Sequence, residues 1–163
     1  MSEKNHFQTL FGYNYQANGR LIDAAARVAV EDYYAEGDYS HGSLHGLLFH
    51  ILRTEHVWRT ILKTGQGPNP PLSLEDFPDL PSLETRWQAE QTAMLTYINS
   101  LSDDELDSEI EATDWRGVAH TMKRWVILEH VILHGMQHRS EAAALLTRFG
   151  QSPGNLDFIF YAE

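Results

Sequence analysis

Residues 128–141 read Leu-Glu-His-Val-Ile-Leu-His-Gly-Met-Gln-His-Arg-Ser-Glu, a stretch that carries histidines at His130, His134 and His138. Residues four apart in an α-helix lie one turn apart on nearly the same face, with Cβ atoms about 5–6 Å apart. Two neighbouring imidazoles of this row can bind one metal ion, whereas all three would spread over about 12 Å along the axis, too far for one ion. A tight site therefore needs a third ligand from elsewhere, and His50 is the best candidate.

Helical periods continue on both sides of this stretch. Apolar residues recur at three- and four-residue intervals from residue 7 to about 34, and again in a segment that Ser43 can cap and Gly65 can end. A third helix is predicted from Ser82 to about residue 101, and the last from about residue 121 to 149, where Gly150 stops it. The chain therefore predicts four long helices.

The connections between these helices differ in character. Residues 66–81 contain five of the six prolines, which predicts a long ordered crossover between the second and third helices. Ser102 with Glu105 fits a cap followed by a short helical turn, and residues 108–120, around Asp114-Trp-Arg-Gly117, predict a short extended pair or loop. Together these features predict an all-α four-helix bundle in a single domain, residues 1–163, whose core can hold a metal.

Composition limits the functions open to this chain. It has no cysteine, which excludes disulfides, thiolate ligands and a cysteine nucleophile. Twelve basic against 23 acidic residues give a formal charge of −11, which opposes binding to nucleic acid or to an anionic membrane. The N-terminus has no apolar signal region, and no apolar run approaches the roughly 18 residues of a membrane span, so we expect a cytoplasmic protein.

Most of the other histidines have an ordinary interpretation. A single histidine in an amphipathic helix or a loop is usually a partly exposed or hydrogen-bonded residue. We interpret five of the nine histidines in this way. The pair His134 and His138 differs, because core-type residues such as Val131 and Leu145 surround it. Spacing alone still leaves metal binding and ordinary packing equally open for this pair. The five histidines with the ordinary interpretation are His6, His41, His45, His56 and His120.

Several segments together resemble a known family. The chain resembles the DinB/YfiT-like family, a family of metal-binding helical bundles, in four places. They are residues 130–146 and the tail 149–158, Tyr15-Gln-Ala-Asn18 in the first helix, and Leu47-Leu-Phe-His50 followed by Glu55 and Trp58 in the second. This resemblance implies a four-helix bundle with up-down-down-up connectivity, a bound divalent metal and frequent homodimers. It also implies that the metal ligands are His50, His134 and His138.

Two residues beside the implied ligands, His130 and Glu141, are not themselves implied as ligands. His130 matches a family position that is usually not a ligand, which implies a packing or supporting role. Many relatives read His-Arg-Gly-Gln where this chain reads His138-Arg-Ser-Glu141. Glu141 could approach the ion, hydrogen-bond a ligand imidazole or pair with a basic side chain. We favour the contact with a ligand imidazole over direct ligation.

Three neutral imidazoles leave an ion with an open coordination position, the pattern of a catalytic site. Nitrogen ligands favour a transition metal; we expect zinc or nickel, with iron, manganese and copper as alternatives. One class of function is an enzyme that acts on a small molecule, either a transferase that uses an exogenous low-molecular-weight thiol and resembles the thiol-dependent members of the family, or a hydrolase with a metal-activated water. The alternative is a non-catalytic metal-binding stress protein, and the sequence leaves both open.

The implied homodimer has candidate contact residues in the aromatic side chains outside the helical stripes. Tyr33, Tyr34, Tyr39 and Phe77 could form such a surface, or they could cover the ends of the bundle.

Overall fold

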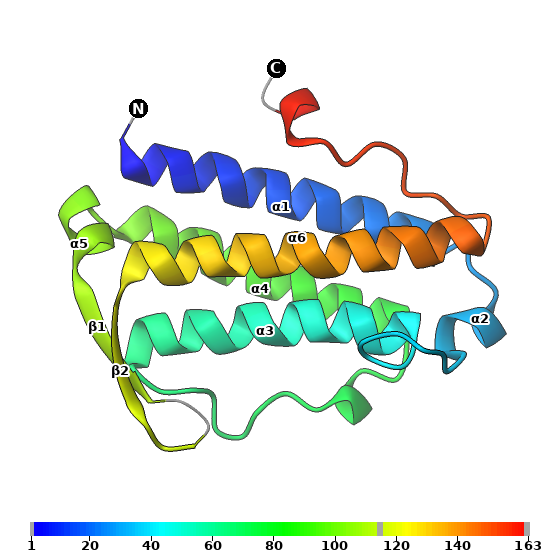
Figure 1. The fold of residues 1–163 in the computed structure, drawn as a ribbon, viewed down its shortest axis with the longest axis horizontal. Coiled ribbons are helices and arrows are strands. Elements are labelled where there is room, and N and C mark those ends of the chain that lie inside the picture. Colours follow the sequence, from blue (N-terminus) through cyan, green and yellow to red (C-terminus); the bar gives the residue numbers. More distant parts are fainter. Residues whose placement is uncertain (1, 114–115, 162–163) are drawn as a thin grey trace.

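The computed structural model describes residues 2–113 and 116–161. Within these residues the chain is mostly helical, with one small antiparallel sheet (Figure 1). The α-helices are α1 (Glu3–Ala25), α2 (Val30–Tyr34), α3 (Leu44–Thr64), α4 (Leu80–Ser100), α5 (Asp103–Asp107) and α6 (Arg124–Arg148). Two 3-10 turns, η1 (Leu74–Asp76) and η2 (Phe158–Phe160), and two strands, β1 (Glu109–Thr113) and β2 (Ala119–Lys123), complete the described elements.

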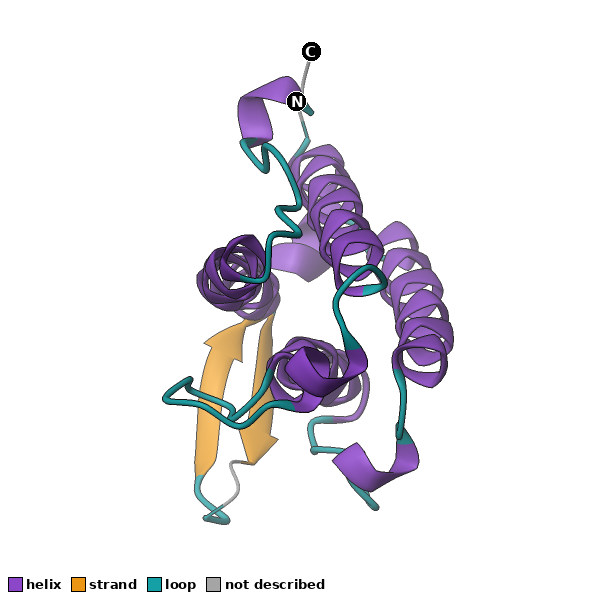
Figure 2. Ribbon diagram, turned by 90° about the vertical axis from the view of Figure 1, so that its right-hand side faces the viewer, coloured by secondary structure: helices purple, strands orange, loops and turns teal. Residues whose placement is uncertain are grey.

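The four long helices α1, α3, α4 and α6 lie side by side (Figure 2). Helix α6 packs against α1 and α3, and α4 packs against the same two helices from the other side. Two apolar clusters fill the interior. One contains Leu21, Leu48 and Leu146, and the other contains Phe11 and Met94. Several polar side chains are also buried, among them His138 of the candidate site described below.

Local sequence signals fix several helix ends as predicted. The Ser43 hydroxyl accepts a hydrogen bond from the Gly46 N–H and caps α3, and Gly65 ends that helix with φ of 76°, a backbone conformation that favours glycine. Ser102 and Glu105 form the predicted capping box of α5. Helix α4 begins earlier than predicted, because Asp79 is its N-cap. Ser82 is the capping-box partner three residues later.

The prediction of one helix from residue 7 to 34 is wrong. Helix α1 ends at Ala25, and after a turn through residues 26–29 the short helix α2 follows. No glycine or proline marks this turn. The turn allows Tyr33 to reach the core, where its ring meets the His45 ring, so burial of this side chain outweighs local helix propensity.

The predicted extended pair is present as a hairpin, and it shortens the last helix. Strands β1 and β2 pair antiparallel, with Ile110 opposite Met122. Helix α6 starts at Arg124 rather than near residue 121, because residues 119–123 are hydrogen-bonded in β2. The predicted centre of this loop includes Asp114 and Trp115, which lie outside the described residues.

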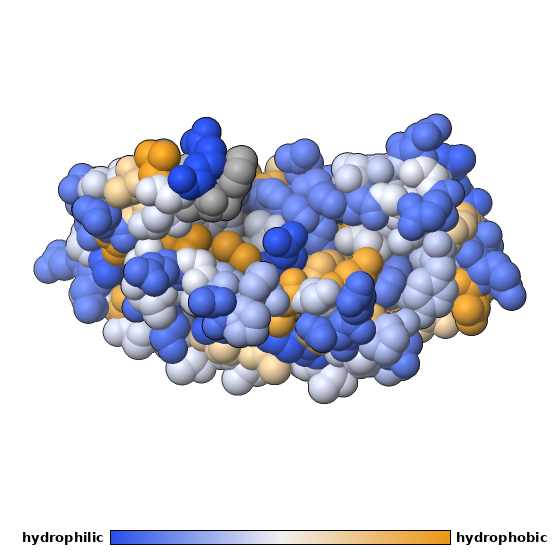
Figure 3. Space-filling model, turned by 90° about the horizontal axis from the view of Figure 1, so that it is seen from below, coloured by the Kyte–Doolittle hydropathy of each residue, from blue (hydrophilic) through white to orange (hydrophobic). Residues whose placement is uncertain are grey.

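The surface is polar (Figure 3), as expected for a chain with a formal charge of −11. The face in Figure 3 is mostly hydrophilic, with apolar residues in separate patches. Among the described residues, no helix combines the length and the apolar character needed to cross a membrane.

Tyr33 and Phe77, two of the predicted dimer contact residues, are buried. They belong to the core at the end of the bundle and are not available as contact residues for a dimer.

Candidate metal centre

Helices α3 and α6 bring the three predicted ligands together. His50 on α3 and His134 on α6 approach each other with 3.0 Å between their Nε2 atoms. The ring centroid of His138 lies 4.6 Å from that of His50 and 4.5 Å from that of His134. The one-turn spacing on α6 thus places two imidazoles beside the one that α3 supplies.

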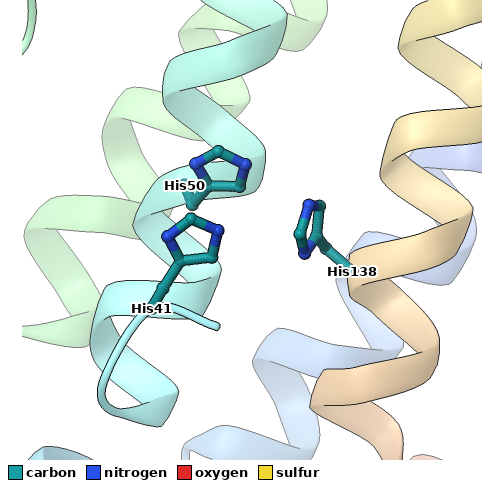
Figure 4. A group of neighbouring side chains, drawn as sticks. All are labelled: His41, His50 and His138. Carbon is teal, nitrogen blue, oxygen red and sulfur yellow. The ribbon is translucent and has the colours of Figure 1, made fainter. Parts of the chain in front are cut away.

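His41 joins this group, which the sequence did not predict. Its ring stacks on His50 with 3.6 Å between centroids and 17° between planes, and lies 5.2 Å from His138. One nitrogen from each of His41, His50 and His138 lies within 4.8 Å of the other two, and Figure 4 shows His138 facing the other two rings from across the gap. From the sequence we gave His41 the ordinary interpretation of a partly exposed histidine, and the structure adds that its ring lies among the candidate ligands. It precedes α3 in a loop, so no helical spacing connects it with the other rings.

His130 stands apart from these rings. Its centroid is 5.6 Å from that of His134, and the ring packs edge-on against Trp58 of α3 at 5.2 Å. The structure thus places His130 one turn further along α6, in a packing contact.

Burial and the neighbouring imidazoles lower the pKa values of His41, His50 and His134. Burial, reinforced by the neighbouring histidines, lowers the pKa of His50 to about 3 and that of His134 to about 4. Burial and the proximity of His138 also lower the pKa of His41. Because only a neutral imidazole has a free lone pair, these rings are ready to bind a cation at neutral pH.

The donor set fits a transition-metal ion. Two nitrogens bound to one ion at 2.0–2.1 Å in tetrahedral geometry lie about 3.3 Å apart, close to the 3.0 Å that separates the Nε2 atoms of His50 and His134. His50 and His134 are half-buried, so the cluster reaches the surface, whereas His138 is buried. The cluster is therefore partly open to solvent.

Glu141 connects the loop before α3 with helix α6. One carboxylate oxygen accepts the Ser40 N–H at 2.9 Å, and the other accepts the Ser40 hydroxyl at 2.7 Å. The second oxygen also lies 3.4 Å from Nδ1 of His138. Burial would raise the pKa of Glu141, but the Ser40 hydrogen bonds and His138 outweigh it and lower that pKa. Glu141 is thus an anion beside a ligand-type imidazole, the arrangement that orients metal-bound histidines.

A separate polar cluster joins α3 to α4. Glu90 is completely buried and accepts hydrogen bonds from Arg59 and, at 3.0 Å, from Arg86, while Nδ1 of His56 lies 3.0 Å from it. This contact explains His56 without a metal. His45 likewise contacts the Phe77 carbonyl oxygen through Nε2 at 2.7 Å. These two histidines have the ordinary hydrogen-bonded role that we expected for them.

A further buried polar group joins α1 to α3 and α6. The Tyr15 hydroxyl donates to Glu55, and Arg139 donates to the side-chain oxygens of Asn14 and Asn18. Burial raises the pKa of Glu55 to about 7, against the lowering effect of the Tyr15 hydrogen bond. The interior of the bundle therefore brings together three parts of the resemblance: residues 15–18, Glu55, and Arg139 beside His138.

Comparisons with known proteins agree with the fold. The DinB family, as a sequence family, matches residues 1–163. A DinB-like protein of Bacillus subtilis, YjoA, superposes with a TM-score of 0.62 at 17% identity, over 88% of this chain and 92% of that one. A conserved protein of Enterococcus faecalis gives 0.63 at 16% identity, over 91% and 97%. No curated protein matches this sequence. At these identities the solved structures show a common fold alone.

Proposed function

Since the chain belongs to the DinB family, we propose that it binds one divalent transition-metal ion through His50, His134 and His138. The observation that carries this proposal is the convergence of neutral imidazoles from α3 and α6, with 3.0 Å between two of the donor atoms. Imidazoles that face one another while partly withdrawn from water are unfavourable by themselves, and a shared cation offsets that cost.

The donor set also indicates which metal to expect. Imidazole nitrogens suit zinc, nickel, iron and copper better than calcium or magnesium, and zinc or nickel is our first expectation. Three imidazoles leave at least one coordination position for an exchangeable ligand. The half-buried rings of His50 and His134 support access to that position from solvent.

The proposed activity is a metal-dependent reaction on a small molecule, either transfer of an exogenous low-molecular-weight thiol or hydrolysis. When bound, a divalent ion would stabilise a thiolate or lower the pKa of a water molecule to about 7. In this proposal His50, His134 and His138 hold the ion, and Glu141 orients the His138 ring from Nδ1. The chain has no cysteine, so any thiol must come from outside.

The proposal includes the assembly implied by the family. The course of the chain in Figure 1 supports the up-down-down-up connectivity of the four long helices, since residues 66–79 return the chain along the bundle between α3 and α4.

We also expect a homodimer, as the family resemblance implies. With Tyr33 and Phe77 buried, half-exposed residues of α6 such as Leu133 and Met136 become the better candidates for its contact surface.

Metal titration tests the ligand assignment. Protein stripped with a chelator should take up one equivalent of zinc or nickel, measured by competition with a coloured indicator. His134→Ala should lose stoichiometric binding, and His6→Ala, which removes an exposed histidine elsewhere on the molecule, should retain it. Equal metal content in the wild type and His134→Ala would overturn the assignment.

Turnover needs a separate experiment. The metal-loaded protein should be screened for thiol conjugation and for hydrolysis, before and after chelation. With cobalt in the site, a small thiol that coordinates the metal should add a charge-transfer band in the near ultraviolet, which His50→Ala should lose. If no thiol or anion perturbs the cobalt spectrum at millimolar concentration, the protein is a metal-binding protein without an open site.

A further inference from the structure

We infer that His41 is a fourth protein ligand of the proposed metal ion, presented by the loop before α3 and displaced when an exogenous ligand binds. This inference rests on the proposed function, because it needs a metal at His50, His134 and His138. It adds a residue that lies on neither of the two ligand-bearing helices.

The position of the His41 ring supports this inference. The ring is stacked on His50 and is 5.2 Å from His138 between centroids, so it borders the same space as the other imidazoles (Figure 4). A nitrogen of His41 belongs to the group of three ligand-type atoms that lie within 4.8 Å of one another. Ligands that share one ion lie about 3.3 Å apart, so closing the set requires a shift of up to about 1.5 Å.

The loop is the part of the site that can make this shift. The backbones of His50, His134 and His138 are fixed in long packed helices, whereas His41 lies between α2 and α3. A ring stacked flat on His50 cannot point its lone pair at the same ion as His50, so it must also turn out of the stack. A ligand that arrives by such a movement can also leave by it, which makes His41 the exchangeable member of the set.

Specific contacts nevertheless hold the loop against the site. Glu141 accepts both the N–H and the hydroxyl of Ser40, the residue directly before His41. The chain turns at Gly42, where φ is 76°. At Gly46 a Cβ atom would lie 2.2 Å from the His41 carbonyl oxygen, so only glycine there allows this approach. These contacts keep the loop within reach of the metal.

Glu141 is therefore a positioning residue for two ligands. Its carboxylate holds the loop of His41 through Ser40, and the same carboxylate lies beside Nδ1 of His138 at 3.4 Å. A glutamine could still accept the Ser40 N–H and donate to the Ser40 hydroxyl oxygen, but both hydrogen bonds would lose the strength that the carboxylate charge gives them. Glu141→Gln should therefore loosen the loop while it preserves side-chain size.

The experiment counts imidazoles and measures competition. X-ray absorption of the zinc-loaded protein should fit four imidazoles in the wild type and three in His41→Ala. Zinc affinity should fall at least about tenfold in His41→Ala and less in Glu141→Gln. A small thiol or free imidazole should bind the cobalt protein more tightly in His41→Ala than in the wild type, because no side chain competes. His130→Ala, which removes a neighbouring imidazole outside the set, should resemble the wild type in all three measurements, and far-ultraviolet circular dichroism checks that each variant is folded.

The outcomes separate this inference from the proposed function. If the wild type binds one metal ion with three imidazoles, and His41→Ala matches it in zinc affinity and in thiol affinity, His41 is not a ligand and the three-histidine site stands. If the wild type binds no metal, the proposed function fails first. A weaker zinc affinity in His41→Ala with unchanged affinity for thiol would also overturn the inference, since it would show that His41 does not occupy the exchangeable position.

Discussion

Replacement of Glu90 by glutamine should destabilise the protein by about 3 kcal/mol at neutral pH. The Glu90 side chain is completely buried on α4 and contacts two arginines and His56. Burial alone would raise its pKa, but the hydrogen bonds from His56 and Arg59 outweigh this effect and lower the pKa from 4.5 to about 2. A difference of roughly 2.5 pKa units corresponds to about 3 kcal/mol. Removing one partner from a buried charge cluster gives a loss of similar size, about 3–5 kcal/mol.

The pH dependence of this loss distinguishes the charge cluster from simple packing. Because the folded-state pKa of Glu90 is depressed, its stabilising contribution is fully present above about pH 4.5 and is lost as the pH falls towards 2. Urea unfolding at several pH values should therefore show a difference between wild type and Glu90→Gln that shrinks below pH 4.5. At neutral pH the melting temperature should fall by about 6–12 °C.

Glu31→Gln is the matched control for this measurement, because Glu31 is exposed on α2. It should change the free energy of unfolding by less than about 0.5 kcal/mol. A difference between wild type and Glu90→Gln that is the same at pH 7 and pH 3 would refute the electrostatic explanation. A difference below about 1 kcal/mol at neutral pH would refute the magnitude.

Three further predictions concern the rest of the molecule. For Glu55 the stability should change with pH in the opposite direction, because burial raises its pKa to about 7. Its contribution to the free energy of unfolding is present below pH 4.5 and is lost as the pH rises through 7. Between pH 4.5 and 8, the free energy of unfolding of Glu55→Gln, measured in urea, should therefore rise relative to the wild type by up to about 3 kcal/mol. Zinc or nickel at about 100 times its dissociation constant should stabilise the wild type by about 2.7 kcal/mol, raising the melting temperature by roughly 5–10 °C, and chelation or His134→Ala should abolish the rise. Light scattering should return twice the chain mass of 18.6 kDa at micromolar concentration, and a value near 18.6 kDa would exclude the homodimer.

The helix ends were predictable where a local hydrogen bond decides them. Ser43 and Gly65 bound α3 as expected, since each acts on backbone groups within one turn of itself. The end of α1 was not predictable in this way. Residues 26–29 carry no helix-breaking signal, and the chain leaves the helix there because Tyr33 is buried against His45. That contact joins residues from two different helices, and no periodicity in either segment encodes it.

The residues of the candidate site likewise differ in whether the sequence could predict them. Spacing on one helix places His130, His134 and His138 in a row, and the family resemblance selected His134 and His138 with His50 as the ligands. His41 could not be found in either way, because its position depends on a contact across 101 residues, from Ser40 to Glu141. The signal that was present in the sequence is the departure at Glu141 itself, where many relatives are expected to have glutamine.

This departure and the extra histidine are explained together by one physical requirement. Ser40 offers two hydrogen-bond donors, its N–H and its hydroxyl, and the Glu141 carboxylate accepts both. An amide at position 141 could accept the Ser40 N–H and donate to the hydroxyl oxygen, but hydrogen bonds to a charged carboxylate are about twice as strong as these neutral ones. A carboxylate at position 141 therefore holds the loop of His41 more strongly than an amide would. By the same argument, relatives with glutamine at this position should lack a histidine that stacks on the α3 ligand, and a survey of their structures for both features would test the coupling.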